Sequence, residues 1–353
     1  MIILNDRQNK ILEFIRKNES SGNKEILDYI SKRDEKVTRL TIVRDLNKLI
    51  KSKLITRTGS GRNAAYQIRE KNPLLLYFDV EKYFQLPPDE RELKLKTFNF
   101  EIFDNFSKNI FAPAELAKLE EFNKDYQRRI KRLSPTLLKK EFERLTIELS
   151  WKSSRIEGNT YSLIDTEILI KEKKEAEGHS KEEAVMILNH KHALDYVIDK
   201  KSDFQKISLA KIENIHKLII KDMGVKENLR QRAVGITGTR FKPLDNEFQI
   251  REALMKMVAI ANSDKIHPLA KSLAVILLVS YIQPFEDGNK RTARILGNAI
   301  LLANHYCPLS YRSIDESDYK KATLLFYEQG SAHFFKELFA KQFQFAVKNY
   351  FLS

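Results

Sequence analysis

Hydrophobic residues recur at spacings of three and four positions through most of the chain, which is the pattern of helices that bury one face. After Pro113 this pattern predicts helices over residues 114–131, 135–152, 164–174, 181–199, 209–221, 249–261, 269–282, 290–303, 315–328 and 334–349. Residues 273–282 are apolar on nearly every side, so we expect that helix to lie in the core. The run as a whole predicts a mostly α-helical domain.

The first 70 residues carry a different order of patterns. They predict three helices and then two strands that flank a polar turn, over residues 6–17, 24–31, 38–51, 54–58 and 65–68. In the first helix Ile11, Leu12 and Ile15 point inward. In the third, helical spacing is kept by Leu40, Val43, Leu46, Leu49 and Ile50. Three helices followed by a hairpin predict a small domain of their own.

Residues 71–112 show no sustained period. Pro73, Pro87 and Pro88 interrupt the segment, and an aromatic stretch follows at 98–103. We expect a connector whose aromatic residues pack between two domains. The predicted organisation is therefore a domain over 1–70, a connector over 71–112 and a helical domain over 113–353.

Charge adds an expectation about partners. The 353 residues include 62 Lys and Arg against 48 Asp and Glu, a net charge of +14, and the first 70 residues hold half of it. Such a balance favours an anionic partner, either a nucleotide or a nucleic acid. A single cysteine, Cys307, excludes an internal disulfide and a cysteine-based zinc cluster, which fits a reducing compartment such as the cytoplasm. We expect no membrane segment, because residues 273–282 are too few to span a bilayer.

The most distinctive chemistry lies between two apolar runs, at residues 283–294. This stretch places an acid, a glycine and three cations where one buried helix ends and the next begins. A helix N-terminus offers unpaired N–H groups to an anion, Gly288 permits a close backbone approach, and Asp287 is placed to hold Mg²⁺. Charge on a phosphate would be neutralised by Lys290, Arg291 and Arg294. The sequence therefore predicts a phosphate site.

This run resembles the signature loop of the Fic family, His-x-Phe-x-Asp/Glu-Gly-Asn-Gly/Lys-Arg-x-x-Arg, at every position except the first. The resemblance covers roughly residues 110–345 and implies a helical fold that transfers AMP from ATP to a hydroxyl of a target protein. It further implies that Asp287 coordinates Mg²⁺ and that Gly288, Asn289 and Lys290 hold the α-phosphate. The outer phosphates would be held by Arg291 and Arg294.

The first position of the signature is Gln283, where the family has a histidine that serves as general base. A carboxamide is not basic near neutral pH and cannot take up the proton of the target hydroxyl. A positioned base contributes roughly 100-fold to 10,000-fold in rate. We therefore expect nucleotide binding to be intact and turnover to be lost or slowed. The sequence leaves open whether the chain is an active enzyme, and whether Gln283 is natural or introduced.

An upstream motif, Ser153 to Gly158, is similar to the inhibitory Ser/Thr-x-x-x-Glu-Gly/Asn element of self-restrained Fic proteins. In that family the glutamate, here Glu157, pairs with the second arginine of the signature, here Arg294. A carboxylate in that place competes with the γ-phosphate of ATP. The resemblance therefore implies a self-inhibited protein.

A third motif lies at residues 233–243, where alternation around Gly238 predicts a β-hairpin. It is similar to the Fic flap, an exposed edge that pairs with an extended segment of a target protein. The residues that would dock the target are Val234, Ile236, Thr237 and Gly238. The target itself is not specified, and a homo-oligomer is left open.

The first 70 residues resemble a winged helix-turn-helix, whose third helix would enter a major groove of DNA. The expected DNA-binding residues are Arg39, Thr41, Arg44, Lys48, Arg57 and Arg62. Three hypotheses follow: a Fic-type adenylyltransferase that uses ATP and Mg²⁺, a DNA-binding regulator whose Fic-like domain binds ATP without catalysis, and a phosphotransferase. The third arises because a related branch that transfers phosphate also has lysine at the Lys290 position, although it has alanine where this chain has Gly288.

Overall fold

The computed structural model describes residues 4–18, 20–32, 37–70 and 72–352. These residues form two compact units that meet between Gln85 and Leu86. The expected connector is thus shared between the units. Its first part joins the first unit, where Asn9 donates a hydrogen bond of 2.6 Å to Asp79. Its aromatic stretch packs within the second unit, where Phe98 stacks on Tyr281 with ring centroids 4.5 Å apart.

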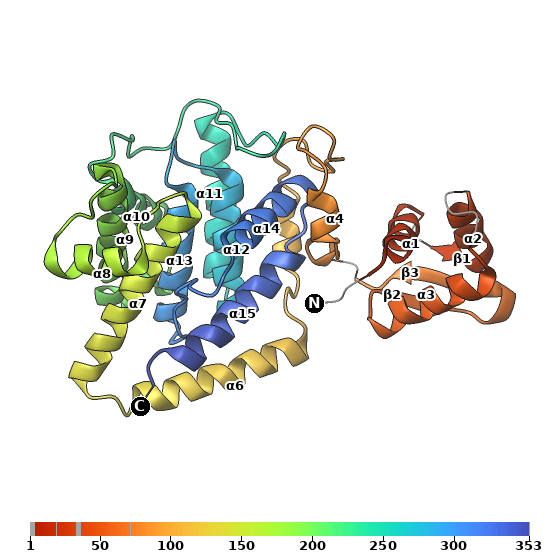
Figure 1. Cartoon of the computed structure of the whole chain (residues 1–353), viewed down its shortest axis with the longest axis horizontal. Helices are drawn as coiled ribbons and strands as arrows, with labels where there is room; N and C mark the ends of the chain where they lie inside the picture. Colours follow the sequence, from red (N-terminus) through yellow and green to blue (C-terminus); the bar gives the residue numbers. More distant parts are fainter. Residues whose placement is uncertain (1–3, 19, 33–36, 71, 353) are drawn as a thin grey trace. The chain divides into compact units, whose positions relative to one another are not determined.

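The first unit consists of short helices and a small antiparallel sheet (Figure 1). The sheet has the strand order β1-β3-β2, with Ser21 opposite Tyr66 and Ile55 opposite Ile68. The three predicted helices and the two predicted strands are confirmed. The elements are α1 (Asp6–Lys17), β1 (Ser21–Gly22), α2 (Asn23–Ser31), α3 (Arg39–Lys51), β2 (Ile55–Thr58), η1 (Gly61–Asn63), β3 (Ala65–Ile68), η2 (Pro73–Leu75) and α4 (Val80–Phe84).

The inner face of α3 differs from the face that its sequence suggested. Leu40 is 70% exposed, whereas Ile42 is 1% exposed and joins Leu46 and Leu49 in the core of this unit. The reason is geometric, because Leu40 and Ile42 are separated by about 200° around a helix of 3.6 residues per turn. Leu40 therefore lies on the solvent side of α3.

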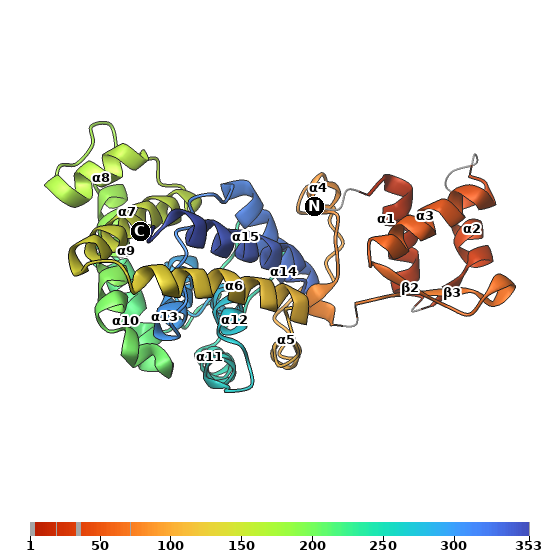
Figure 2. The same cartoon turned by 90° about the horizontal axis from the view of Figure 1, so that it is seen from below.

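The second unit is helical, and every helix predicted after Pro113 is confirmed. Figure 1 and Figure 2 both place α12 and α13 among the other helices, with α14 and α15 to one side. The elements are α5 (Ile102–Phe106), α6 (Pro113–Ile130), α7 (Pro135–Ile156), α8 (Leu163–Glu172), α9 (Lys181–Asp199), η3 (Lys201–Gln205), α10 (Leu209–Ile220), α11 (Glu247–Asn262), α12 (Pro268–Ile282), α13 (Asn289–Ala303), α14 (Glu316–Gln329) and α15 (His333–Asn349).

The centre of this unit is the contact between α12 and α13. Gly297 permits that contact, because a Cβ atom there would lie 2.6 Å from Cγ1 of Ile276. The hydroxyl of Ser272 donates to the carbonyl of Gly297 at 3.0 Å, which satisfies a polar group in the apolar interface. α12, the most apolar of these helices, is too short to cross a membrane. Within the described parts of the chain no other helix has the necessary length and apolarity. The packing fixes both ends of the loop that joins the two helices.

The expected β-hairpin at residues 233–243 is wrong. All of these residues are described, none lies in a strand, and the segment is an extended loop that turns at Thr237–Gly238. Its second limb pairs elsewhere, since the N–H of Lys242 donates to the carbonyl of Lys96 at 3.0 Å and Thr97 forms a parallel bridge with Lys242. Arg91 also donates to the carbonyl of Gly238. The backbone groups of the second limb therefore do not form a ladder with the first.

A candidate nucleotide site at the start of α13

The loop between α12 and α13 makes two left-handed turns. α12 ends at Gln283 with φ of 50°, and α13 starts after Gly288, which has φ of 78°. A Cβ atom at Gly288 would lie 3.0 Å from Cγ2 of Ile220, so glycine is favoured by both conformation and space. The first N–H groups of a helix have no acceptor within that helix. The loop therefore leads into a helix N-terminus that is ready to bind an anion.

Aromatic packing on its buried side and the amide side chain of Asn289 hold the loop in place. Phe285 is fully buried and stacks on His216, with ring centroids 3.6 Å apart. His216 Nε2 donates to the carbonyl of Asp287 at 3.0 Å, and burial lowers the pKa of His216, so that its ring is neutral. Asn289 Oδ1 accepts from the N–H of Phe285 at 2.9 Å, while its Nδ2 donates to the carbonyl of Phe285 at 2.8 Å. These contacts hold the backbone of the loop from residue 285 to residue 289.

Gln283 takes part in the same network. Its Oε1 accepts a hydrogen bond of 3.0 Å from Asn289 Nδ2, and its Nε2 donates to the carbonyl of Ser280 at 2.6 Å. A longer contact of 3.5 Å joins Nε2 to the hydroxyl of Tyr327. The carboxamide is thus oriented by three partners, yet it offers no basic nitrogen.

Arg294 and Glu157 form a buried ion pair at the floor of the site. Arg294 is fully buried, and its Nη2 donates to Glu157 Oε1 at 2.8 Å. Lys290 Nζ lies 3.6 Å from the other carboxylate oxygen. Burial raises the pKa of Glu157, but the opposing effect of Arg294 and then Lys290 is larger in sum and lowers it to about 2. Glu157 is therefore ionised at neutral pH and occupies two cations that could bind phosphate.

A second set of contacts fixes the arginine independently of Glu157. Arg294 Nε donates to Ser153 Oγ at 2.8 Å, and Nη2 donates to the Ser153 carbonyl at 2.9 Å. His190 Nδ1 donates to the carbonyl of Met186 at 2.9 Å, and burial lowers the pKa of His190 to about 3. His190 Nε2, 2.7 Å from Ser153 Oγ, therefore accepts a hydrogen bond from the hydroxyl of Ser153, and a lone pair of Ser153 Oγ is left to accept from Arg294.

Arg291 and Asp287 form a second pair at the rim. Arg291 is 2% exposed, its Nη2 lies 2.8 Å from Asp287 Oδ2, and its Nη1 contacts Met223 Sδ at 3.3 Å. The Asp287 side chain is 62% exposed. Mg²⁺ usually binds one or two carboxylates together with phosphates and water, and an accessible Asp287 fits that requirement. Among the described residues no cluster of three metal-ligating side chains exists.

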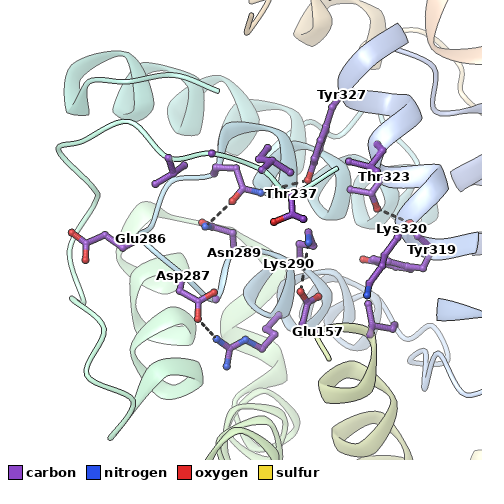
Figure 3. Close-up of a pocket in the computed structure, with 18 residues that line it drawn as sticks. Glu157, Thr237, Glu286, Asp287, Asn289, Lys290, Tyr319, Lys320, Thr323 and Tyr327 are labelled. Atoms are coloured by element: carbon purple, nitrogen blue, oxygen red, sulfur yellow. Dashed lines mark hydrogen bonds and ion pairs between the residues drawn. The ribbon is translucent and has the colours of Figure 1, made fainter. Parts of the chain in front are cut away.

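These residues surround a cavity of about 410 Å³ (Figure 3). In it Lys290 and Glu157 point toward each other, while Glu286 points outward. The predicted site residues that line the cavity are Gln283, Asp287, Gly288, Asn289, Lys290, Arg291, Glu157, Val234, Ile236 and Thr237. Arg294 and Ser153 lie buried beneath it. Gly158 and Gly238 are not among the lining residues.

Sequence reasoning missed the wall that α14 contributes. Tyr319, Thr323 and Tyr327 line the cavity, together with Lys320 and Leu324 (Figure 3). The hydroxyls of Tyr319, Thr323 and Tyr327 recur at every fourth position, so these three side chains share one face of the helix. That spacing was the signal in the sequence that could have found them.

The residues expected to bind DNA lie on a different unit from this cavity. Arg39, Arg44, Lys48 and Arg57 are exposed. Thr41 is half-buried, and its hydroxyl lies 3.0 Å from that of Thr38 at the start of α3. The side chain of Arg62 lies outside the described residues.

The fold is that of known Fic structures. The chain resembles Fic-1 from Caenorhabditis elegans with a TM-score of 0.57 and 21% identity, over 67% of this chain and 71% of that one. It resembles a Fic domain-containing signaling protein from Bacteroides thetaiotaomicron with a TM-score of 0.54 and 22% identity, over 66% of this chain and 92% of that one. At such identities the likeness establishes the fold.

The sequence comparisons name the domain. Residues 206–301 match the model of the Fic/DOC family. A protein adenylyltransferase Fic from Nematostella vectensis is 31% identical over 48% of this chain and 40% of its own length. Another from Culex quinquefasciatus is 27% identical over 49% of this chain and 35% of its own length. The chain therefore contains a Fic domain and has Fic protein adenylyltransferases as homologues, although it spans less than half the length of these relatives.

Proposed function

We propose that the chain is a self-inhibited protein adenylyltransferase scaffold in which Gln283 limits turnover. The observation that carries the proposal is the 2.8 Å ion pair between Glu157 and Arg294 at the floor of a cavity lined by the start of α13. A buried arginine that a carboxylate neutralises is a ready site for a phosphate, provided that the carboxylate leaves.

ATP would bind with its phosphates over the first turn of α13. The N–H groups of Asn289 and Lys290 suit the α-phosphate, and the guanidinium groups of Arg291 and Arg294 suit the outer phosphates. Asp287 would hold Mg²⁺, which when bound supplies additional neutralisation of the phosphate charge. Bound ATP competes with Glu157 for Arg294, which accounts for self-inhibition.

Transfer needs an acceptor hydroxyl in line with the α-phosphorus. The hydroxyl oxygen forms a bond to that phosphorus, the bond to the β-phosphate oxygen breaks, and pyrophosphate leaves. The hydroxyl proton must pass to a base at position 283. Gln283 lines the cavity at that place but cannot accept the proton, so we expect a large loss of rate relative to a histidine.

The target protein would dock on the first limb of the flap. Val234 and Ile236 are half-buried and Thr237 is exposed, and all three border the cavity. The second limb already pairs with the chain's own Lys96. An extended target segment would therefore add along residues 233–237, with its hydroxyl directed into the cavity.

One experiment tests the proposal. The chain and its Gln283→His, Glu157→Gly and doubly substituted forms are incubated with Mg²⁺ and α-labelled ATP, and label on protein is counted. We expect label in the double variant and little in the unsubstituted chain. Absence of label from a folded double variant that is offered a cell extract would contradict adenylyl transfer. Label from γ-labelled but not α-labelled ATP would instead support phosphotransfer by the same loop.

A second candidate is a DNA-binding regulator in which the Fic domain only senses ATP. The observation that favours it is the solvent face of α3, where exposed residues recur at helical spacing: Leu40, Arg44, Asn47, Lys48 and Lys51. This face joins cations, an amide and one apolar side chain, which together match phosphates, base edges and a thymine methyl group. The order of helices followed by a hairpin further supports a winged helix-turn-helix.

A further inference from the structure

Arg230, which precedes the flap, has an unusual environment for an arginine. It is 1% exposed, and its guanidinium donates to main-chain carbonyls and not to a carboxylate. Nε donates to the carbonyl of Gln283 at 2.5 Å, and Nη1 donates to that of Arg232 at 2.7 Å. Nη2 donates to the carbonyls of Leu244 and, at 3.4 Å, Ile282. The main-chain N–H of Arg230 donates to the carbonyl of Pro284 at 3.0 Å.

The five carbonyls belong to two structures. Ile282, Gln283 and Pro284 form the end of α12 and the start of the signature loop. The other two, Arg232 and Leu244, stand at the two ends of the flap segment. One side chain therefore joins both ends of the flap to the backbone of the position that carries the catalytic residue in the family.

Electrostatics explains how a buried cation is tolerated here. Burial lowers the pKa of Arg230, with Asp245 acting in the opposite sense. The last carbonyls of a helix have no donor within it and form the negative end of its dipole. Arg230 satisfies these carbonyls at the end of α12, and its planar fork reaches several acceptors at once, which a lysine cannot do.

We propose that Arg230 is a positioning residue that sets the distance between the target-docking flap and residue 283. The inference rests on the proposed adenylyl transfer and extends it to the acceptor side of the reaction. The groups assigned to the phosphates, Asn289, Arg291 and Arg294, make their hydrogen bonds with other partners. Loss of Arg230 should therefore disturb the alignment of the acceptor and spare the binding of ATP.

The test uses three variants of the full chain. Arg230→Gln removes the charge and most donors, whereas Arg230→Lys keeps the charge and removes the fork. Arg232→Gln is the matched control, because Arg232 is an exposed arginine of the same loop whose carbonyl, not its side chain, contacts Arg230. Each change is made in the chain with Gln283 and in the form that also carries Gln283→His and Glu157→Gly.

The first readout needs no activity. Hydrogen exchange of the amides of residues 231–244 is followed without nucleotide, and we expect faster exchange in Arg230→Gln, a smaller increase in Arg230→Lys and no change in the control. Unchanged exchange at the flap would overturn the proposal. If Arg230→Gln does not fold, the same comparison is made between Arg230→Lys and the control.

The second readout separates alignment from binding. In the Gln283→His, Glu157→Gly form we expect the rate of α-label transfer to fall about 100-fold in Arg230→Gln, since a misplacement of about 1 Å has that effect. Calorimetry should give an unchanged affinity for ATP with Mg²⁺. A parallel loss of ATP affinity and thermal stability would show a general structural role and overturn the proposal. If the parent form itself binds no ATP, the proposed function fails, and the exchange experiment still decides whether Arg230 anchors the flap.

Discussion

Helices α3 and α13 have similar lengths and both carry arginine and lysine, yet they use these residues in opposite ways. On α3 the cations Arg39 and Arg44 are exposed to solvent. On α13 the side chain of Arg294 is completely buried and that of Arg291 is 2% exposed, each against a carboxylate at 2.8 Å. The difference teaches that residue type alone does not tell a binding surface from a binding site. Burial and partners decide which it is.

Substitution of the exposed cations on α3 and of the buried arginines on α13 should therefore change the stability of the fold by different amounts. An exposed cation interacts through water and salt, so its removal has a small effect on the fold. A buried arginine is matched to fixed partners, and its removal leaves them unpaired. Measurements on one helix can therefore be set directly against measurements on the other.

The largest difference is expected when one arginine is removed from each helix. Arg294→Met leaves Ser153 and Glu157 without their donor, and we expect a loss of about 3–5 kcal/mol in the free energy of unfolding. Arg44→Met should change it by no more than about 0.5 kcal/mol. Urea unfolding checks this: fluorescence of Trp151, the sole tryptophan, follows the second unit. Circular dichroism follows the helices of both units, so that a change in dichroism without a change in fluorescence reports the first unit. Equal losses for the two variants would contradict the comparison.

Acid should weaken the buried pair specifically. The pKa of Glu157 is about 2 in the folded chain against an ordinary value of 4.5, so its ionised form stabilises the fold above pH 4.5 and that stabilisation is lost as pH falls toward 2. The expected loss is about 2 kcal/mol by pH 3, out of about 3 kcal/mol in full, and it should be absent from Glu157→Gln. Unfolding of both proteins is measured from pH 7 to pH 3, with Glu286→Gln as an exposed control. If the free energies of unfolding of the unsubstituted chain and of Glu157→Gln change in parallel with pH, the ion pair is not formed in solution.

Removal of the inhibitory carboxylate should strengthen ATP binding. Glu157→Gly removes the carboxylate that neutralises Arg294, while Ser153 still holds the arginine side chain in place. A charge-assisted hydrogen bond contributes about 1.5–3 kcal/mol, so we expect about a tenfold to hundredfold rise in affinity for ATP with Mg²⁺. Calorimetry measures it, and Glu286→Gly is the control. An unaltered affinity would show that Glu157 does not compete with the nucleotide.

The smallest effect is expected on α3, whose cations are exposed to solvent. If α3 binds DNA, Arg44→Ala should lower the affinity for duplex DNA by about tenfold and reduce the slope of log affinity against log salt by about one when the contact is to phosphate. Fluorescence anisotropy at several salt concentrations measures both quantities. Lys17→Ala, an exposed cation on α1, serves as control. Failure of the unsubstituted chain to bind duplex DNA at low salt would contradict the DNA-binding hypothesis.

The sequence by itself determined the helices, the small β-containing unit and the place of the phosphate loop. These features are local. Apolar spacing fixes where α12 and α13 lie, and the polar run with Gly288 between them can only be the turn that joins them. The Fic signature could be recognised for the same reason, because its residues are neighbours in the chain.

Only the tertiary structure decided which charges are buried and what they meet. Arg230 stands between Leu229 and Gln231 in a polar stretch, and no periodicity marks it as the residue that joins the flap to α12. Pairing of the flap with Lys96, the solvent position of Leu40 and the hydrogen bond of Ser153 to His190 were equally absent from local patterns. Such contacts join residues far apart in the chain and depend on how whole helices pack. Local spacing indicates that a helix buries one face, but it does not specify the partner of that face or, as Leu40 shows, every residue that belongs to it.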